Sequence, residues 1–162
     1  MSQSKNYQVG SRITEFEAES SSGKSVGLSS LKGKWTVVYF YPKDSTPGCT
    51  LQGQQFQKLL PKYKALGAQV FGVSRDSIAS HCKFIDKQGF KFELLSDEDE
   101  HLCNLFDVIH MKNMYGKKIL GVVRSTFLIS PKLEIVQEWR KVKSDGHAGE
   151  VLESLKSLSA KE

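Results

Sequence analysis

The residues of this chain best suited to chemistry surround Cys49, in the segment 41–50. Residues 35–41 are mostly β-branched or aromatic and predict a buried strand. Downstream, apolar residues recur at helical spacing from Phe56 to Leu66. Cys49 is therefore predicted to lie in the first turn of a helix, where unpaired backbone N–H groups and the helix dipole favour an anion. A thiol placed there ionises more readily than a free cysteine and becomes a nucleophile.

The rest of the chain predicts the elements that position this turn. The expected strands are residues 69–74, 92–95, 125–130 and 133–139, with a short edge strand inside 24–34, and the expected helices are 49–66, 78–88, 102–106 and 149–158. Residues 113–121 are rich in Gly and Lys with little periodicity, so they are predicted to be a loop. A βαβ unit, a further strand and helix, a hairpin and a last helix together predict an α/β fold, with a central mixed sheet flanked by helices.

Length and composition indicate one soluble globular domain over residues 1–162, with a loose N-terminus over 1–8. Hydrophobic residues make up 39% of the 162 and charged residues 25%. The N-terminus has no apolar signal core, and no apolar run is long enough to cross a bilayer. The three cysteines are far apart and form no C-x-x-C pair. This cysteine usage predicts a reducing, cytoplasmic location rather than a secreted disulfide framework.

Charge and motif content argue against several other partners. The net charge is +5 and the pI about 9.1, but the lysines are dispersed and no basic run reaches five residues, so no nucleic-acid partner is expected. The four histidines show no regular spacing with one another or with the cysteines, so no metal site is predicted. No Gly-rich phosphate loop is present, and no cofactor is expected.

The spacing from Pro42 through Thr46 to Cys49 resembles the active-site signature of the peroxiredoxins. The flanking residues are similar to the bacterioferritin comigratory protein or peroxiredoxin Q branch of that family. Further stretches that match are residues 72–77, 94–97, 113–117, 124–129, 139–143 and 146–147. The resemblance covers nearly the whole chain and implies a thioredoxin-like fold. It also implies a function, that of a thiol peroxidase acting on hydrogen peroxide and organic hydroperoxides.

In such an enzyme Cys49 would attack the peroxide O–O bond and become a sulfenic acid. A resolving thiol and a thioredoxin-type reductant would then return it to the thiol. Members of this branch are often monomeric, so a monomer is expected here.

The resemblance also assigns roles to residues around Cys49. Arg124 would supply a fixed positive charge to the sulfur and the peroxide oxygens. The hydroxyl of Thr46 would accept the peroxide proton while donating toward the sulfur, and the N–H of Gly48 would add to the helix-terminus field. Pro42 would shield the thiolate from water. Each has an ordinary alternative: a surface arginine at 124, a helix cap at 46 and a strand terminator at 42.

The second cysteine departs from the two common arrangements of this branch. One places the resolving cysteine five residues after the first, where this chain has Gln54, and the other places it at a position matching Ile85. Cys82 lies one helical turn before Ile85 and is predicted to be the resolving cysteine. The alternatives are a one-cysteine mechanism and resolution by Cys103, which is flanked by apolar residues and is expected to be a core thiol.

Two other functions fit a reactive cysteine on such a fold. A thiol–disulfide oxidoreductase is disfavoured because the C-x-x-C pair is missing. A peroxide-sensing or chaperone-like redox protein would react with one equivalent of peroxide and then stop. Turnover with thioredoxin distinguishes it from a peroxidase.

Overall fold

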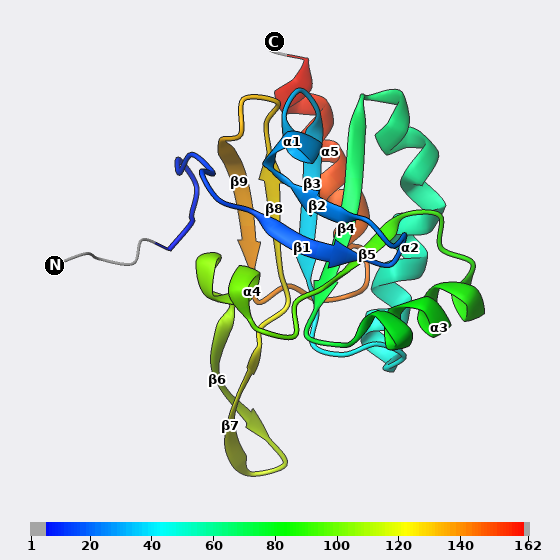
Figure 1. Cartoon of the computed structure of the whole chain (residues 1–162), viewed down its shortest axis with the longest axis vertical. Helices are drawn as coiled ribbons and strands as arrows, with labels where there is room; N and C mark the ends of the chain where they lie inside the picture. The colour runs from blue at the N-terminus through cyan, green and yellow to red at the C-terminus, as the bar shows by residue number, and fades with distance from the viewer. Residues whose placement is uncertain (1–5, 161–162) are drawn as a thin grey trace, which may run out of the picture.

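The computed structural model describes residues 6–160 (Figure 1). Its elements are β1 (Glu17–Ser20), β2 (Ser25–Gly27), α1 (Leu28–Leu31), β3 (Trp35–Phe40), α2 (Pro47–Ala65), β4 (Ala68–Ser74), α3 (Ile78–Gln88), β5 (Glu93–Ser96), α4 (His101–Leu105), β6 (Ile109–Met114), β7 (Lys117–Val122), β8 (Ser125–Ile129), β9 (Ile135–Arg140) and α5 (His147–Ser159). The main sheet has seven strands in the order β2-β1-β5-β4-β3-β8-β9. Strands β3, β4 and β5 run parallel, and the other neighbouring pairs in this sheet are antiparallel. The predicted mixed sheet is confirmed.

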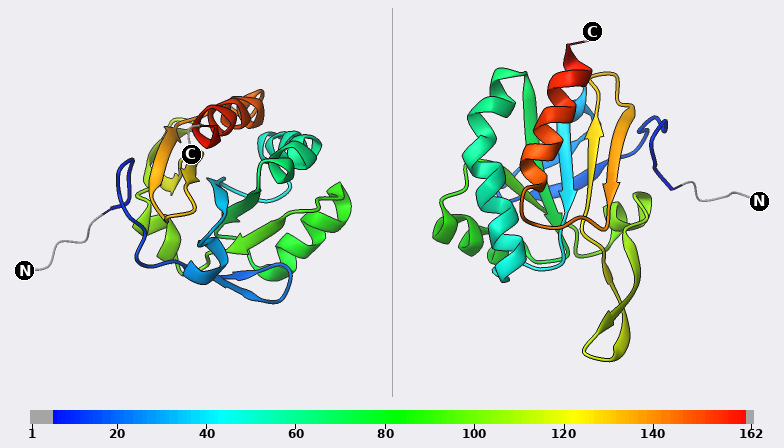
Figure 2. Two further views of the ribbon diagram at one scale, coloured as in Figure 1. Left: turned by 90° about the horizontal axis from the view of Figure 1, so that it is seen from above. Right: turned by 180° about the vertical axis from the view of Figure 1, so that it is seen from behind.

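The central strand β3 is buried along its whole length, because side chains cover both faces of the sheet. Val37 and Tyr39 point into a core shared with α2, α3 and α5, whereas Val38 and Phe40 point into a second core with α4 and the N-terminal segment. Figure 2 shows α2 and α5 next to each other on one face of the sheet. A hydrogen bond of 2.6 Å from the Tyr63 hydroxyl to the Ala148 carbonyl links these two helices. The apolar run in β3 therefore reflects burial on both sides, as its composition predicts.

The junction between β3 and α2 places the cysteine turn at the carboxyl end of the central strand. The helix begins at Pro47, two residues earlier than predicted. Proline is favoured at this first position because its φ angle already suits a helix and its missing N–H would have no partner there. Cys49 is thus the third helical residue, within the first turn as expected.

The prediction of a loop over residues 113–121 is wrong. These residues belong to the hairpin of β6 and β7, which projects away from the main sheet (Figure 1). Its turn has positive φ at Tyr115 and Gly116, at 54° and 81°, as two-residue hairpin turns require. Lysine has a low strand propensity, and the cross-strand partners that offset it, such as Met111 and Leu120, become neighbours only in the folded chain.

The N-terminal segment contacts the rest of the protein where the structure describes it. Residues 1–5 lie outside the described part of the chain, but Tyr7 is buried and its backbone N–H donates to the Leu105 carbonyl at 2.6 Å. Strand β1, which was not predicted, follows this segment and pairs with β5. Of the helices within residues 6–160, none is long and apolar enough to cross a membrane.

Candidate active site

Cys49 is buried. Its side chain is 2% exposed and packs in the core that contains Tyr39 and Phe56. The thiol is free, as are the other two in the chain. The surrounding apolar walls limit water around the sulfur, so a charged partner acts on it more strongly than it would in solvent.

Arg124 contacts the sulfur from the segment between β7 and β8. Its Nη2 donates to Cys49 Sγ at 3.5 Å, and its Nη1 donates to Gln52 Oε1 at 2.6 Å. Two separate contacts orient the planar guanidinium, so its charge is held at the thiol. The structure therefore brings together the pair that the sequence analysis proposed.

Gln52 was not identified from the sequence. It follows Cys49 by three residues on the same side of α2, and its side chain is fully buried. Its Oε1 holds Arg124, while its Nε2 has no hydrogen-bond partner within the described residues. The i,i+3 spacing from Cys49 is the signal in the sequence that could have pointed to it.

Gly48 leaves space for this contact. A methyl group on Gly48 would lie 3.2 Å from Arg124 Nη2 and 2.9 Å from the hydroxyl of Ser144. A side chain there would displace the guanidinium or the serine, so glycine permits the close approach. Ser144 was likewise absent from the sequence-based site, because only the folding of the segment after β9 brings it next to α2.

Thr46 and Pro42 lie on the approach to the helix. Thr46 occupies the N-cap position, but its hydroxyl makes no capping bond and instead donates to the Lys43 carbonyl at 2.9 Å. In this arrangement the hydroxyl neither caps the helix nor donates toward the sulfur. Pro42 is half-buried directly after Tyr41, where the chain leaves the sheet.

Lys112 provides a second positive charge that the sequence analysis missed. It lies on β6, and its Nζ donates to the Val122 carbonyl at 2.9 Å. Desolvation lowers the pKa of Lys112, nearby Arg124 lowers it further, and Cys49 acts in the opposite direction. Lys112 could not be recognised from the sequence, because it lies on the unpredicted hairpin.

The other two cysteines differ in environment. Cys82 is half-buried on α3, with its Sγ 3.8 Å from the Ser21 carbonyl. Cys103 has no exposed surface, and burial, aided by the neighbouring Asp97, raises the pKa of its thiol well above the ordinary value. Neither is bonded to Cys49. Cys103 thus has the inert character expected of a core thiol.

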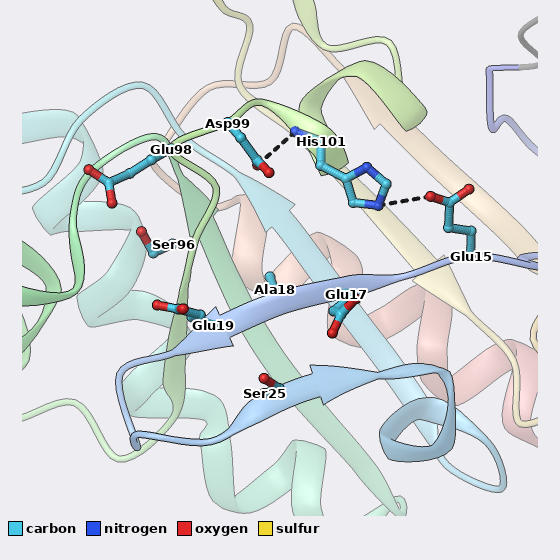
Figure 3. A pocket seen from close by; sticks show the side chains of 9 residues that line it. All are labelled: Glu15, Glu17, Ala18, Glu19, Ser25, Ser96, Glu98, Asp99 and His101. Carbon is cyan, nitrogen blue, oxygen red and sulfur yellow. Dashed lines mark hydrogen bonds and ion pairs between the residues drawn. The ribbon is translucent and has the colours of Figure 1, made fainter.

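A separate hollow is lined mainly by carboxylates from β1 and the segment after β5 (Figure 3). In this hollow His101 Nε2 lies 3.1 Å from Glu15 Oε2, and the backbone N–H of His101 donates to Asp99 Oδ1 at 3.2 Å. It includes none of the side chains around Cys49. Within residues 6–160, no cluster of three or more His, Cys, Asp or Glu is arranged to hold a metal ion.

The fold and this site define a class of protein: a thioredoxin-like sheet with one buried thiol in the first turn after its central strand, and a fixed arginine at the sulfur. The AhpC/TSA family model matches residues 9–138. The chain belongs to the AhpC/TSA family, as a peroxiredoxin of the bacterioferritin comigratory protein or peroxiredoxin Q branch.

Similar proteins and structures support this assignment. The chain is 58% identical to Peroxiredoxin Bcp of Xanthomonas campestris over 137 residues, covering 85% of this chain and 86% of that protein. It is 42% identical to Peroxiredoxin Bcp of Bacillus subtilis over 154 residues, covering 95% and 98%. A solved structure of the X. campestris bacterioferritin comigratory protein matches with a TM-score of 0.85 and 54% identity, covering 89% of this chain and 92% of the other. A mutant of Xylella fastidiosa PrxQ matches with a TM-score of 0.90 and 45% identity, covering 95% and 98%. The predicted thioredoxin-like fold is confirmed.

Proposed function

We propose that Cys49 is the nucleophile through which this peroxiredoxin reduces hydroperoxides. Thiol peroxidase activity follows from the family and from the named relatives. The observation that supports Cys49 as the reacting residue is its 3.5 Å contact with Arg124 at the start of α2. Among the described residues no cation donates a hydrogen bond to the Cys103 sulfur, and burial raises the pKa of that thiol.

The reaction moves negative charge from sulfur to oxygen. The Cys49 thiolate attacks one peroxide oxygen, the O–O bond breaks, and the departing oxygen takes a proton to leave as water or an alcohol. Cys49 becomes a sulfenic acid. Because the guanidinium of Arg124 has donors on both Nη atoms, it can stabilise charge first on sulfur and then on the leaving oxygen. Gln52 acts as a positioning residue, since it holds the second Nη.

Thr46 is proposed to accept a hydrogen bond from the peroxide hydroxyl. Its own hydrogen is committed to the Lys43 carbonyl, so the lone pairs of its oxygen remain free to accept. Gly48 and Pro42 are proposed to bound the substrate position, the first by its backbone N–H in the first turn of α2 and the second by covering the thiolate.

The Thr46 proposal gives a prediction with a matched pair of variants. Thr46→Ser keeps the hydroxyl and should retain most of the rate of peroxide reduction. Thr46→Val keeps the shape without the hydroxyl and should lose roughly 10²-fold, the loss typical when one positioned hydrogen-bond partner of the reacting groups is removed. Stopped-flow measurement of single-turnover peroxide reduction compares the two. Equal rates for Ser and Val would show that the hydroxyl only braces the turn through Lys43.

Resolution of the sulfenic acid is proposed to use Cys82 and then a thioredoxin-type protein. The family implies a peroxide substrate and a thiol reductant in general. All three cysteines are free thiols, which agrees with a reducing compartment such as the cytoplasm. We also propose a single-domain monomer, which the resemblance to this branch implies.

Turnover tests the proposed function as a whole. With thioredoxin, thioredoxin reductase and NADPH, the protein should consume many equivalents of hydrogen peroxide and of an organic hydroperoxide, and Cys49→Ser should consume none. Alkyl hydroperoxides are proposed as substrates because the X. campestris relative has alkyl peroxide reduction activity. A protein that reacts with one equivalent and then stops, with thioredoxin present, would instead be a sensor.

A further inference from the structure

A buried polar cluster connects the loop before Cys49 to the helix that carries Cys82. Its centre is Asp44, whose carboxylate is almost fully buried. One oxygen accepts from the Tyr41 hydroxyl at 2.6 Å. The other accepts from the Ser80 hydroxyl at 2.7 Å and lies 2.7 Å from His81 Nδ1. Ser80 and His81 belong to the first turn of α3, directly before Cys82.

The protonation of this cluster follows from its partners. His81 has no exposed surface, and its Nε2 lies 2.8 Å from the Leu95 carbonyl, which can only accept. Nε2 therefore carries a hydrogen, and a second proton must lie between Nδ1 and Asp44. Burial and Asp44 itself raise the pKa of Tyr41, so its hydroxyl stays a donor. Histidine and aspartate thus form a buried pair with every polar atom satisfied, and removing one member would leave the other unpaired.

Two further contacts hold the same loop. The backbone N–H of Asp44 donates to Asp76 at 2.9 Å, and Asp76 also accepts from the Ser74 hydroxyl at 2.6 Å. Between Asp44 and Thr46, Ser45 adopts a φ of 64°, a conformation that non-glycine residues adopt at a cost. The loop is therefore kept in an unfavourable conformation by its contacts with α3 and with Asp76 in the segment between β4 and α3.

Formation of a disulfide requires this arrangement to open. In the proposed resolution step, Cys82–SH attacks the sulfenic sulfur of Cys49, the S–O bond breaks, an S–S bond forms and water leaves. Cys49 starts buried in α2 and Cys82 starts on α3 against Ser21. The Cα atoms must come within roughly 7 Å of each other with suitably directed side chains. Local unfolding of the first turns of α2 and α3 costs less than global unfolding and provides the route.

We propose that Asp44 and His81 form a latch that holds the first turns of α2 and α3 closed and so sets the rate at which Cys82 reaches oxidised Cys49. The proposal rests on the assignment of Cys82 as the resolving cysteine. Both latch residues are positioning residues, because they contact neither the sulfur nor the peroxide. A weaker latch speeds resolution and shortens the time during which Cys49 remains a sulfenic acid open to further oxidation.

The first test measures opening without any catalysis. In a Cys49→Ser background, alkylation of Cys82 by iodoacetamide should be roughly tenfold faster in Asp44→Asn than in the unaltered latch, which corresponds to about 1.4 kcal/mol. Amide exchange should accelerate in α3 and remain unchanged in α5, which distinguishes local opening from general destabilisation. Ser80→Ala removes only one of the three bonds to Asp44, and it provides a milder variant if Asp44→Asn folds poorly. The matched control is Glu15→Gln, which removes a carboxylate from the surface pair with His101.

The second test measures resolution itself in proteins with Cys49 intact. Rapid quenching after one equivalent of peroxide should show the Cys49–Cys82 disulfide forming faster in Asp44→Asn and Ser80→Ala, with less sulfinic acid at high peroxide. In a Cys82→Ser background the same latch variants should have no effect on sulfinic acid. Unchanged alkylation in a folded Asp44→Asn protein overturns the latch. Faster alkylation without faster disulfide formation overturns its control of resolution. Absence of a Cys49–Cys82 bond in the oxidised wild type would instead overturn the assignment of Cys82 as the resolving cysteine. This result is obtained before any latch variant is made, so the two failures are distinguishable.

Discussion

Arg124→Ala is expected to slow the reduction of peroxide by Cys49 about 10²–10³-fold, the loss typical when one preorganised donor to a developing anion is removed. The guanidinium lies 3.5 Å from the sulfur in a site where Cys49 is 2% exposed. Water cannot replace it efficiently there, so the charge on sulfur and on the leaving oxygen loses its main partner. Stopped-flow measurement of the single-turnover rate against hydrogen peroxide gives the effect directly.

Two further variants show whether the position or only the charge matters. Arg124→Lys keeps the charge but cannot contact Cys49 and Gln52 together, so it should recover only part of the rate. Arg75→Ala is the matched control, because Arg75 pairs with Glu100 at the surface and makes no contact with Cys49. A rate for Arg124→Ala within twofold of the wild type, or an equal loss in Arg75→Ala, would contradict the role given to Arg124.

Cys82→Ser is expected to abolish nearly all thioredoxin-dependent turnover while the first reduction of peroxide stays fast. Without a partner thiol, Cys49 should persist as a sulfenic acid and accumulate as sulfinic acid when peroxide is in excess. Mass spectrometry of peptides under non-reducing conditions should find a Cys49–Cys82 bond in the wild type and none in the variant.

Cys103→Ser provides the control for this experiment. Burial raises the pKa of the Cys103 thiol and the residue has no exposed surface, so its replacement should leave cycling intact. Wild-type cycling by Cys82→Ser would establish a one-cysteine mechanism. A Cys49–Cys103 bond in the peptide map would identify the other thiol as the resolving one.

Features encoded over a short stretch of chain could be predicted from the sequence. The strand over residues 35–41 and the helix after it follow from local composition and periodicity, so the location of Cys49 in a first helical turn was predictable. The cap of α3 by Ser77, which accepts from the Ser80 N–H at 3.1 Å, and its end at Gly89 were also predictable for the same reason. The β6–β7 hairpin was not, because its strands are stabilised by cross-strand pairs rather than by their own residues.

By itself the sequence determined the family and the helix turn that carries Cys49, and it pointed to Cys49 as the nucleophile, because each depends on residues close together in the chain. Only the tertiary structure decided the surroundings of the sulfur. Arg124 lies 75 residues from Cys49 and reaches it because β8 pairs with β3. The same packing decided that Gln52 holds that arginine and that Asp44 meets His81 across 37 residues. Contacts of this range depend on which strands and helices become neighbours, and no local pattern carries that information.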